Sequence, residues 1–402
     1  MANGDASWDG IAQAMIEAKS PMRSARLRFS LALAASALLA ACAVVPDQGR
    51  NQPSNQPAPP PPSLPTDVGR NRVALLVPMT GINAAAGQAL ANATTMALLD
   101  TNATSLRITT YDTGNGAAAA ASRALADGNR LILGPVQADE AQQVGAMAHN
   151  ARVPVISFSN DAGVAGNNVF VMGTVPTQSV ARVVRFAKAR GITRFAALVP
   201  VGSYGARVSN ALIMATKASG AMLVGMESYD QSRNGLSNAV RRLKARGSYQ
   251  AVLVGDTARV AALAAPLLKA NAPAVRILGT ELWGTDAAST QTPALYGAWY
   301  AALSDQRYPR FAESYRQRFG DTPYRLSTLG YDSVLLALRI AREWQPGTLF
   351  PTQRLYDRGG FLGLDGIFRF NDTDVIERSL EVREARWGTA SVVSPAPTRF
   401  ED

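Results

Sequence analysis

An alternation of short apolar runs with helix-forming stretches constrains the fold of this chain more than any other feature. Its first unit is Val73–Val77, an unbroken apolar run that is too short for an amphipathic helix and that ends at Pro78 and Gly81. This run predicts a strand buried on both faces, and the residues from Ala84 to Leu99 predict the helix that follows it. Repetition of such a unit requires parallel strands with helices covering the sheet. The sequence therefore predicts an α/β protein.

Further units of this kind follow up to residue 278. The expected strands are Val73–Val77, Leu106–Tyr111, Leu131–Leu133, Val153–Phe158, Phe195–Val199, Met222–Tyr229, Ala251–Val254 and Val275–Leu278. The expected helices are Ala84–Leu99, Ala117–Ala126, Ala138–Asn150, Thr177–Arg190, Ala206–Ser219, Leu236–Ala245 and Thr257–Leu268. Because four strands precede the connection at Phe170–Pro176 and four follow it, we expect two sheets rather than one. Thr80 lies in the turn after the first strand, which either is a plain connection or contributes to a ligand site.

The alternation stops after Leu278, and the last third of the chain predicts a different arrangement. Gly297–Ser304 is interpreted as an extended crossover, and Tyr308–Phe319 and Leu326–Trp344 as helices. Gly366–Phe370 and Glu377–Trp387 are interpreted as a final strand pair. A chain that returns late to its first lobe forms two lobes with several crossovers and a binding cleft between them. The predicted lobes are residues 71–176 plus 298–345 and residues 177–297 plus 346–390, with residues 391–402 as a tail.

The N-terminal region has the pattern of a secretion signal. Met22–Arg28 is basic and Phe29–Ala40 is apolar but too short to span a bilayer permanently, so residues 1–41 are interpreted as a signal peptide, with Met22 as an alternative start. The sequence before Cys42 resembles the lipobox of bacterial lipoproteins, which implies lipidation of this cysteine. Because no aspartate directly follows it, the resemblance implies sorting to the outer membrane, facing the periplasm. Residues 42–70 are rich in proline and predict a linker.

The composition excludes several classes of site. One cysteine and one histidine leave no internal disulfide and no Cys/His zinc site, and His149 is interpreted as a surface or cap residue. The net charge of +10 would suit nucleic acid, anionic lipid or an acidic polymer without deciding among them. Val201 stands where a nucleophile elbow around Ser203 needs its first glycine, so no catalytic serine is predicted. We expect no enzyme, no cofactor, no metal and no nucleic-acid partner.

A set of motifs in this order resembles the type I periplasmic binding proteins of the leucine/isoleucine/valine-binding kind. The resemblance covers about Arg72 to Trp387 and implies two lobes that close on a small molecule. The motifs are Leu76–Gly81, Tyr111–Thr113, Ile132–Pro135, Val153–Ser157, Ser203–Gly205, Phe311 with Tyr315, and Tyr331–Ser333. The resemblance to these binding proteins implies a fold in which each lobe is a parallel sheet flanked by helices.

The same resemblance implies candidate residues for the cleft. Glu281 matches the acid that binds a ligand ammonium group in amino-acid receptors of this fold, and Tyr204 matches an aromatic cleft residue. Ser157, Ser159 and Asn160 could donate hydrogen bonds to a polar ligand. Where those receptors hold the ligand carboxylate with a hydroxyl cluster, this chain has Gln137-Ala138-Asp139-Glu140, whose acids would repel a carboxylate.

The C-terminal region resembles a more specific group, the penicillin-binding-protein activator lipoproteins. Phe361–Phe370 and Ile376–Leu380 carry this resemblance. It implies a non-enzymatic lipoprotein that activates or regulates a peptidoglycan synthase, a penicillin-binding protein. These activators include larger relatives with an extra N-terminal helical-repeat domain, and here a linker occupies that place. The alternative hypothesis is the substrate-binding lipoprotein of an ABC transporter for branched-chain amino acids, amides or similar small polar ligands.

Overall fold

The first five strands form one parallel sheet, sheet A, in the computed structural model, which describes residues 69–400 except 231, 233 and 271. The strands are β1 (Asn71–Val77), β2 (Leu106–Asp112), β3 (Leu131–Leu133), β4 (Val155–Ser157) and β5 (Val169–Val171), in the order β2-β1-β3-β4-β5. The register of β1 and β2 runs from Asn71 opposite Leu106 to Val77 opposite Asp112. Sheet A is the basis of the first lobe.

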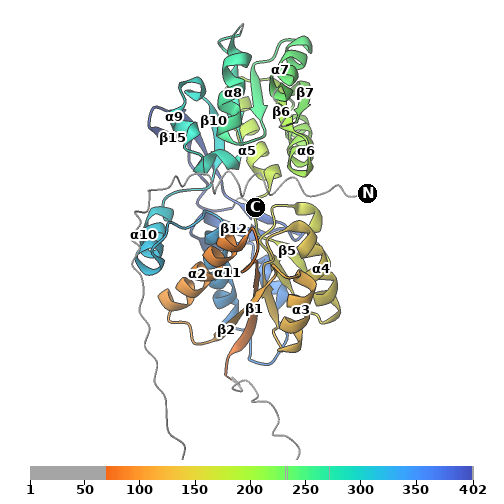
Figure 1. Ribbon diagram of the computed structural model, residues 1–402, viewed down its shortest axis with the longest axis vertical. Coiled ribbons are helices and arrows are strands. Elements are labelled where there is room, and N and C mark those ends of the chain that lie inside the picture. The colour runs from red at the N-terminus through yellow and green to blue at the C-terminus, as the bar shows by residue number, and fades with distance from the viewer. Residues whose placement is uncertain (1–68, 231, 233, 271, 401–402) are drawn as a thin grey trace, which may run out of the picture. The chain divides into compact units, whose positions relative to one another are not determined.

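Helices cover both faces of sheet A, as the unbroken apolar strands require. On one side of β1 lie α2 (Ala84–Asp100) and α11 (Ser327–Ala341), and on the other lie α3 (Ala117–Ala126) and α4 (Ala138–Asn150) (Figure 1). The alanine-rich face of α3 packs closely on the sheet, since all four of its buried residues are alanines. Gly330 of α11 leaves room for the Leu90 carbonyl of α2, which would lie 2.6 Å from an added Cβ.

Sheet B forms the second lobe and is mixed rather than wholly parallel. Its strands are β6 (Arg194–Pro200), β7 (Met222–Tyr229), β8 (Ala251–Val254), β9 (Arg276–Gly279), β10 (Trp299–Ala302), β14 (Glu381–Arg386) and β15 (Thr389–Ser394). They lie in the order β15-β14-β10-β9-β8-β6-β7, with β14 antiparallel to both of its neighbours. Around the sheet lie α5 (Pro176–Ala189), α6 (Ser203–Ala218), α7 (Gly235–Ala245), α8 (Ala258–Lys269), η2 (Glu281–Thr285), α9 (Ala288–Gln291) and η3 (Pro293–Leu295).

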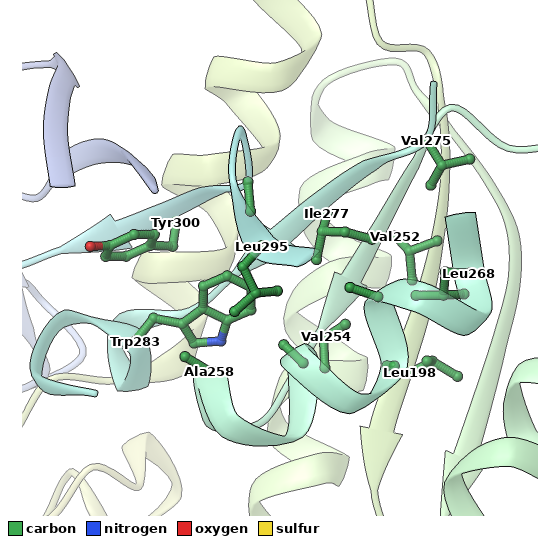
Figure 2. Packing of buried hydrophobic residues seen from close by; sticks show 14 of the residues in the cluster. Leu198, Val252, Val254, Ala258, Leu268, Val275, Ile277, Trp283, Leu295 and Tyr300 are labelled. Carbon is green, nitrogen blue, oxygen red and sulfur yellow. The ribbon is translucent and has the colours of Figure 1, made fainter. Parts of the chain in front are cut away.

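Buried side chains fill both sides of sheet B. On one side, Trp283 of η2 packs with Leu295 and Tyr300 near one end of β9, and Val252, Leu268 and Val275 extend the cluster toward the other end (Figure 2). On the opposite side, Phe195, Val199 and Leu253 pack against α5 and α6.

A small third sheet completes the first lobe. Sheet C contains β11 (Phe361–Gly363), β12 (Gly366–Phe370) and β13 (Ile376–Arg378), all antiparallel. It joins sheet A through an edge-on contact of Phe370 with Phe170, whose ring centroids lie 5.4 Å apart, and through a bridge between Val171 and Val375. The remaining elements are η1 (Ala162–Val164), α10 (Tyr308–Phe319) and η4 (Thr352–Tyr356).

Strand pairing corrects the predicted lobe boundaries. Residues 299–302 are not an extended crossover but the strand β10 of sheet B, and residues 361–378 belong with the first lobe rather than the second. Glu381–Arg386 pairs in sheet B instead of with Gly366–Phe370, and residues 391–394 of the predicted tail lie in β15. Each of these pairings is made over a long sequence separation, which local apolar patterns do not encode.

Buried ion pairs fix the segments that cross between the lobes. Arg325, just before α11, donates to Asp305 at 2.5 Å and to Asp365 at 2.7 Å. Asp305 also pairs with Arg383 of β14 at 2.6 Å. Arg325 and Asp365 are almost fully buried, so this pair is stable only because each charge has a close partner. The network ties the segment after β10 to sheet B and to the loop between β11 and β12.

Candidate functional site

Most of the candidate cleft residues lie at the carboxyl ends of strands. Thr80 follows β1, Gln137 comes shortly after β3, Ser157 ends β4, Tyr204 lies in the first turn of α6 after β6, and Glu281 comes just after β9. This is the edge where ligands bind in parallel α/β sheets, because the strand-to-helix turns of neighbouring strands meet there. Within the second lobe, the fold brings Ser179, Tyr204 and Glu281 into contact, although they lie up to about one hundred residues apart in the chain.

The carboxylate of Glu281 is held by two hydroxyl groups of the second lobe. The Tyr204 hydroxyl donates to its Oε1 at 3.0 Å, and the Ser179 hydroxyl, in the first turn of α5, donates to its Oε2. Burial raises the pKa of Glu281 above its ordinary value, although these two hydrogen bonds and the charge of Arg207 oppose that shift. Burial also raises the pKa of Tyr204, so its hydroxyl stays protonated and can donate. Glu281 is thus an oriented acceptor for a ligand ammonium or amide group.

Trp283 anchors the short helix that carries Glu281. Its ring packs flat on Gly279, where an added Cβ would lie 2.3 Å from the nearest ring atom. Its Nε1 donates to the carbonyl of Asp256 at 2.8 Å. Because the side chain is fully buried, η2 is held against the end of β9, and the position of Glu281 is fixed by packing rather than by the ligand.

An ion pair joins the two lobes next to this carboxylate. Arg207 of α6 donates from Nη1 to Asp161 at 2.8 Å and from Nη2 to the side chain of Asn160 at 3.3 Å. Asn160 and Asp161 lie in the loop after β4 in the first lobe. The Nε atom of Arg207 is buried and has no hydrogen-bond partner among the described residues. A buried donor of this kind can bind a ligand oxygen at little further desolvation cost.

Thr80 is engaged by the neighbouring strand-to-helix turn. Its hydroxyl donates to Oδ2 of Asp112 at 2.7 Å, and the backbone N–H groups of Met79 and Gly114 donate to Oδ1 at 2.7 and 2.8 Å. The hydrogen bond from Thr80 is the largest cause that lowers the pKa of Asp112. Asp112 therefore ties the turn after β1 to the turn after β2, and Thr80 supports this wall of the site.

Gln137 and Glu140 occupy the start of α4, where the resemblance to amino-acid receptors implies hydroxyl residues. Gln137 is the N-cap residue, and its half-buried side chain makes no capping hydrogen bond. Burial raises the pKa of Glu140 to about 7, against the opposing effects of the Gln137 backbone N–H and the Thr113 hydroxyl. Its Oε2 is buried without a hydrogen-bond partner among the described residues. Above pH 7 the ionised Glu140 can accept a hydrogen bond but is unsuited to a ligand carboxylate.

The serines after β4 shape the loop that holds Arg207. Ser157 is fully buried, and its hydroxyl donates to the carbonyl of Pro135 at 3.1 Å and accepts from the N–H of Ser159. The Ser159 hydroxyl accepts from the N–H of Asp161 at 3.1 Å. Both side chains therefore support the turn that presents Asn160 and Asp161, a role that their position in the sequence does not reveal.

Replacing Glu140 with glutamine is expected to change stability in a pH-dependent way. A carboxyl group whose pKa is raised from 4.5 to about 7 in the folded state stabilises the protein fully below pH 4.5, and this contribution is lost as the pH rises through 7. Glu140→Gln should match the wild type at pH 4.5 and should be more stable at pH 8, by about 3 kcal/mol. Urea unfolding of the full-length protein at both pH values measures this.

The control for this prediction is Glu313→Gln, since Glu313 is a half-exposed residue of α10 that pairs with Arg316 on the surface. It should shift the stability equally little at both pH values. A Glu140→Gln effect that is the same at pH 4.5 and at pH 8 would show that the carboxyl group is not desolvated in the folded protein.

The structure joins the predicted residues Tyr204 and Glu281 directly and adds others that sequence reasoning missed. Ser179 and Arg207 contact Glu281 or the opposite lobe, and no local motif marks either residue. Asp161 could have been suspected only from its place after the serines. Cys42 lies outside the described residues.

Within residues 69–400, leaving aside the three undescribed positions, no cluster of three or more His, Cys, Asp or Glu side chains is placed to hold a metal ion. In the same part of the chain, no helix combines the length and the apolarity that crossing a membrane requires.

Comparison with known families and structures gives a consistent match. Residues 71–353 match the profile of a family described as periplasmic binding protein. An uncharacterised protein of Rickettsia prowazekii is 24% identical over 173 residues, which are 42% of this chain and 46% of that protein, so the match spans about half of the relative.

The similar solved structures show the same fold. A putative branched-chain amino acid ABC transporter protein from Rhodospirillum rubrum has a TM-score of 0.69 at 21% identity, covering 81% of this chain and 100% of that one. A leucine-binding protein from Thermotoga maritima has a TM-score of 0.60 at 19% identity over 81% and 98%. A solute-binding protein of Rhodopseudomonas palustris, in complex with 3,4-dihydroxybenzoic acid, has a TM-score of 0.62 at 16% identity over 83% and 98%.

Proposed function

The chain belongs to the family of periplasmic binding proteins, and from this premise we propose that it is the substrate-binding protein of an ABC transporter. Its ligand is a small polar molecule with an amino or amide group, bound between the two lobes. Members of the family are binding proteins rather than enzymes, which agrees with the expected lack of a catalytic residue set. The ligand class of this chain follows from its own side chains, because relatives with less than 25% identity share only the fold.

The combination of Glu281 with the nearby Arg207 carries this proposal. Glu281 is an acceptor fixed by Tyr204 and Ser179, and Arg207 is an adjacent donor whose Nε is free of protein partners among the described residues. The charge of Arg207 lowers the pKa of Glu281, which places the two groups within electrostatic reach of one another. A zwitterion or an amide complements such a pair, with its N–H groups on Glu281 and its oxygen on Arg207.

The first lobe narrows the ligand further. Gln137 offers an amide, and Glu140 offers a buried carboxyl oxygen where a receptor for free amino acids needs hydroxyl donors. Above pH 7 a ligand carboxylate directed at α4 would meet the ionised Glu140, whereas an amide or amine would find an acceptor there. We therefore expect higher affinity for amides and amines that direct a neutral group or a hydrogen-bond donor toward α4. Branched-chain amino acids that direct their carboxylate toward α4 should bind more weakly.

Calorimetric titration of the full-length protein, purified in a mild detergent, tests this function. The panel contains branched-chain amino acids, their amides, short aliphatic amides and a hydroxybenzoate. We expect at least one amine or amide to bind with a dissociation constant in the micromolar range. This corresponds to a binding free energy on the order of −8 kcal/mol. Binding of the hydroxybenzoate alone would contradict the role given to Glu281, because that ligand has no amino or amide group.

Activation of a peptidoglycan synthase remains the second candidate function. The residues that resemble the activator lipoproteins lie mainly in sheet C, and most of their large side chains are buried: Phe361, Phe368, Phe370, Ile376 and Leu380. Such residues serve packing, so the resemblance does not mark an exposed surface for a synthase. Capture of a penicillin-binding protein by the full-length protein, together with an absence of ligand binding, would favour the activator.

We also propose that the protein is anchored to the outer membrane through Cys42. The lipobox-like sequence before this cysteine and the absence of an aspartate directly after it support the anchor. Cys42→Ser should prevent lipidation and move the protein from the membrane fraction to the soluble fraction of the cell envelope. Ala43→Ser is the control and should stay with the membrane. Unchanged fractionation of Cys42→Ser would refute the anchor.

A further inference from the structure

A polar cavity lies at the end of the second lobe that is opposite to the candidate cleft. It measures about 190 Å³ and is lined by Lys269, by residues 273–277 before and within β9, and by Tyr296, Gly297 and Ala298 before β10. Glu281 follows the carboxyl end of β9, whereas this cavity surrounds the amino end. Figure 2 shows Val275 and Trp283 at the two ends of this region. The strand alone separates the two places by roughly 13 Å, at about 3.3 Å per residue.

Two cations, Lys269 and Arg276, line this cavity, and no carboxylate is among the lining residues. Lys269 ends α8, and its Nζ donates to the carbonyl of Ala294 at 2.9 Å. Arg276 opens β9, and its Nη1 donates to the carbonyl of Gly297. Burial, and then the charge of Arg276, lower the pKa of Lys269. Both side chains are only partly exposed, so their mutual repulsion is screened less than that of a surface pair.

Glu384, an acid outside the residues that line the cavity, interacts with Arg276 but is already engaged by other donors. Glu384 of β14 lies close enough to Arg276 for the arginine to lower its pKa, but its two oxygens already accept from other groups. The Trp299 Nε1 donates to its Oε2 at 3.0 Å, and the Arg386 Nε donates to its Oε1 at 3.1 Å. The Trp299 ring lies against Arg276, whose guanidinium carbon is 4.3 Å from the ring centroid. Arg276 therefore lines the cavity between the Trp299 ring and the Gly297 carbonyl.

Tyr296 supplies a third donor. Its hydroxyl is buried and has no hydrogen-bond partner among the described residues. A buried hydroxyl without a hydrogen-bond partner destabilises the folded protein. A bound ligand that accepts its hydrogen bond would remove this destabilisation. The ring is held by an edge-on contact with Trp387 at 6.1 Å between ring centroids, so the hydroxyl does not depend on a ligand for its place.

We propose that this cavity is a second binding site and that it takes a phosphate group, either as inorganic phosphate or as a small phosphomonoester. An ammonium, a guanidinium and a phenolic hydroxyl can donate to separate oxygens of a tetrahedral anion. The volume admits a phosphate with a few water molecules, since a water takes about 30 Å³. The site is independent of the proposed cleft ligand, because no residue is shared.

Titration of the full-length protein with inorganic phosphate in the calorimeter tests this site. We expect a dissociation constant on the order of 1 mM or lower. Lys269→Met and Arg276→Met should each weaken phosphate binding at least ~10-fold, and Tyr296→Phe by a few-fold, because hydrogen bonds to charged groups contribute more than neutral ones. Lys217→Met changes an exposed lysine of α6 and is the matched control.

The outcomes separate this site from a purely structural role and from the cleft. Lys217→Met and Glu281→Gln should both bind phosphate as the wild type does, whereas loss of phosphate binding in Glu281→Gln would place the anion in the cleft and overturn the proposal. If Lys269→Met and Arg276→Met lower only the unfolding temperature, or if the wild type binds no phosphate, the two cations merely cap the loops at Ala294 and Gly297.

The source of the phosphate is identified by competition. Glycerol phosphate that displaces inorganic phosphate would indicate a free phosphomonoester. Displacement by a short-chain phosphatidic acid but not by glycerol phosphate would indicate a lipid headgroup. Both results support a site for a phosphate group, and they identify its source as a free phosphomonoester or a lipid headgroup.

Discussion

Replacing Glu281 with glutamine is expected to weaken binding of the cleft ligand by roughly 100-fold, because a charge-assisted hydrogen bond contributes up to about 3 kcal/mol. Glutamine keeps the size of the side chain but removes the charge that attracts an ammonium group. Its amide nitrogen would also face the hydroxyl of Ser179 or Tyr204, both of which now donate to the carboxylate. Calorimetric titration of wild type and Glu281→Gln with the best ligand of the panel measures the loss.

Two further variants test whether the loss of affinity is specific to the carboxylate of Glu281. Glu343→Gln changes a residue whose side chain is more than half exposed, and it should leave ligand affinity unchanged. Tyr204→Phe removes one of the two hydroxyl groups that orient Glu281 and should weaken binding by a few-fold. If Glu281→Gln binds as tightly as the wild type, the ligand does not contact this carboxylate and the proposed site is wrong.

The pH dependence of binding follows from the same group. Because burial raises the pKa of Glu281, its carboxylate becomes protonated at a higher pH than that of an ordinary glutamate. The affinity for an ammonium ligand should therefore fall on acidification, and this fall should be absent in Glu281→Gln.

Replacing Gly87 with alanine is expected to destabilise the protein by about 3 kcal/mol or more, although alanine is the better helix former by up to about 1 kcal/mol. An added Cβ at Gly87 would lie 1.8 Å from the carbonyl oxygen of Pro78, so either α2 or the end of β1 must move. Urea unfolding of the full-length protein measures the change.

In the second lobe, a helix approaches the end of a strand equally closely at a glycine. This supports the steric explanation for the expected effect of Gly87→Ala. An added Cβ at Gly205 of α6 would lie 1.7 Å from the carbonyl oxygen of Pro200 at the end of β6. Gly205→Ala should therefore be destabilising to a similar degree. Gly69→Ala is the control, because no atom lies within 4 Å of its added Cβ. A stability of Gly87→Ala equal to or above that of the wild type would mean that α2 does not approach Pro78 so closely.

Much of the fold could be predicted because several central strands are buried on both faces. Continuous apolar runs mark such strands, and β3 and β8 begin and end at the predicted residues, as does the less buried edge strand β7. The helices α3, α4 and α10 also have the predicted bounds. β5 was missed because it has only three residues and lies in a stretch interpreted as a connection.

Pairing across long sequence distances could not be predicted from local pattern. β10 lies between β9 and β14, and β14 follows it by about eighty residues in the chain. The apolar pattern of Gly297–Ser304 indicates an extended segment but not its partner. For the same reason, the local pattern places the residues of sheet C in the second lobe and does not predict that sheet B is mixed.

The residues of the candidate site were likewise only partly predictable from the sequence. Glu281 and Tyr204 were found by resemblance, because they lie at recognisable places after strands. Ser179 and Arg207 were not found, since each lies on a helix with no motif, and only the fold brings Ser179 to Glu281 and Arg207 to Asp161. The role of Glu140 depends on its burial, which an acidic stretch in the sequence does not indicate.

Native mass spectrometry of the full-length protein, purified from the cell envelope in a mild detergent, tests the central claim most directly. We expect the wild type to carry one small molecule with an amino or amide group, and Glu281→Gln to carry none. A wild type that stays empty after incubation with the amine and amide panel, and that captures a peptidoglycan synthase, would contradict the transport function.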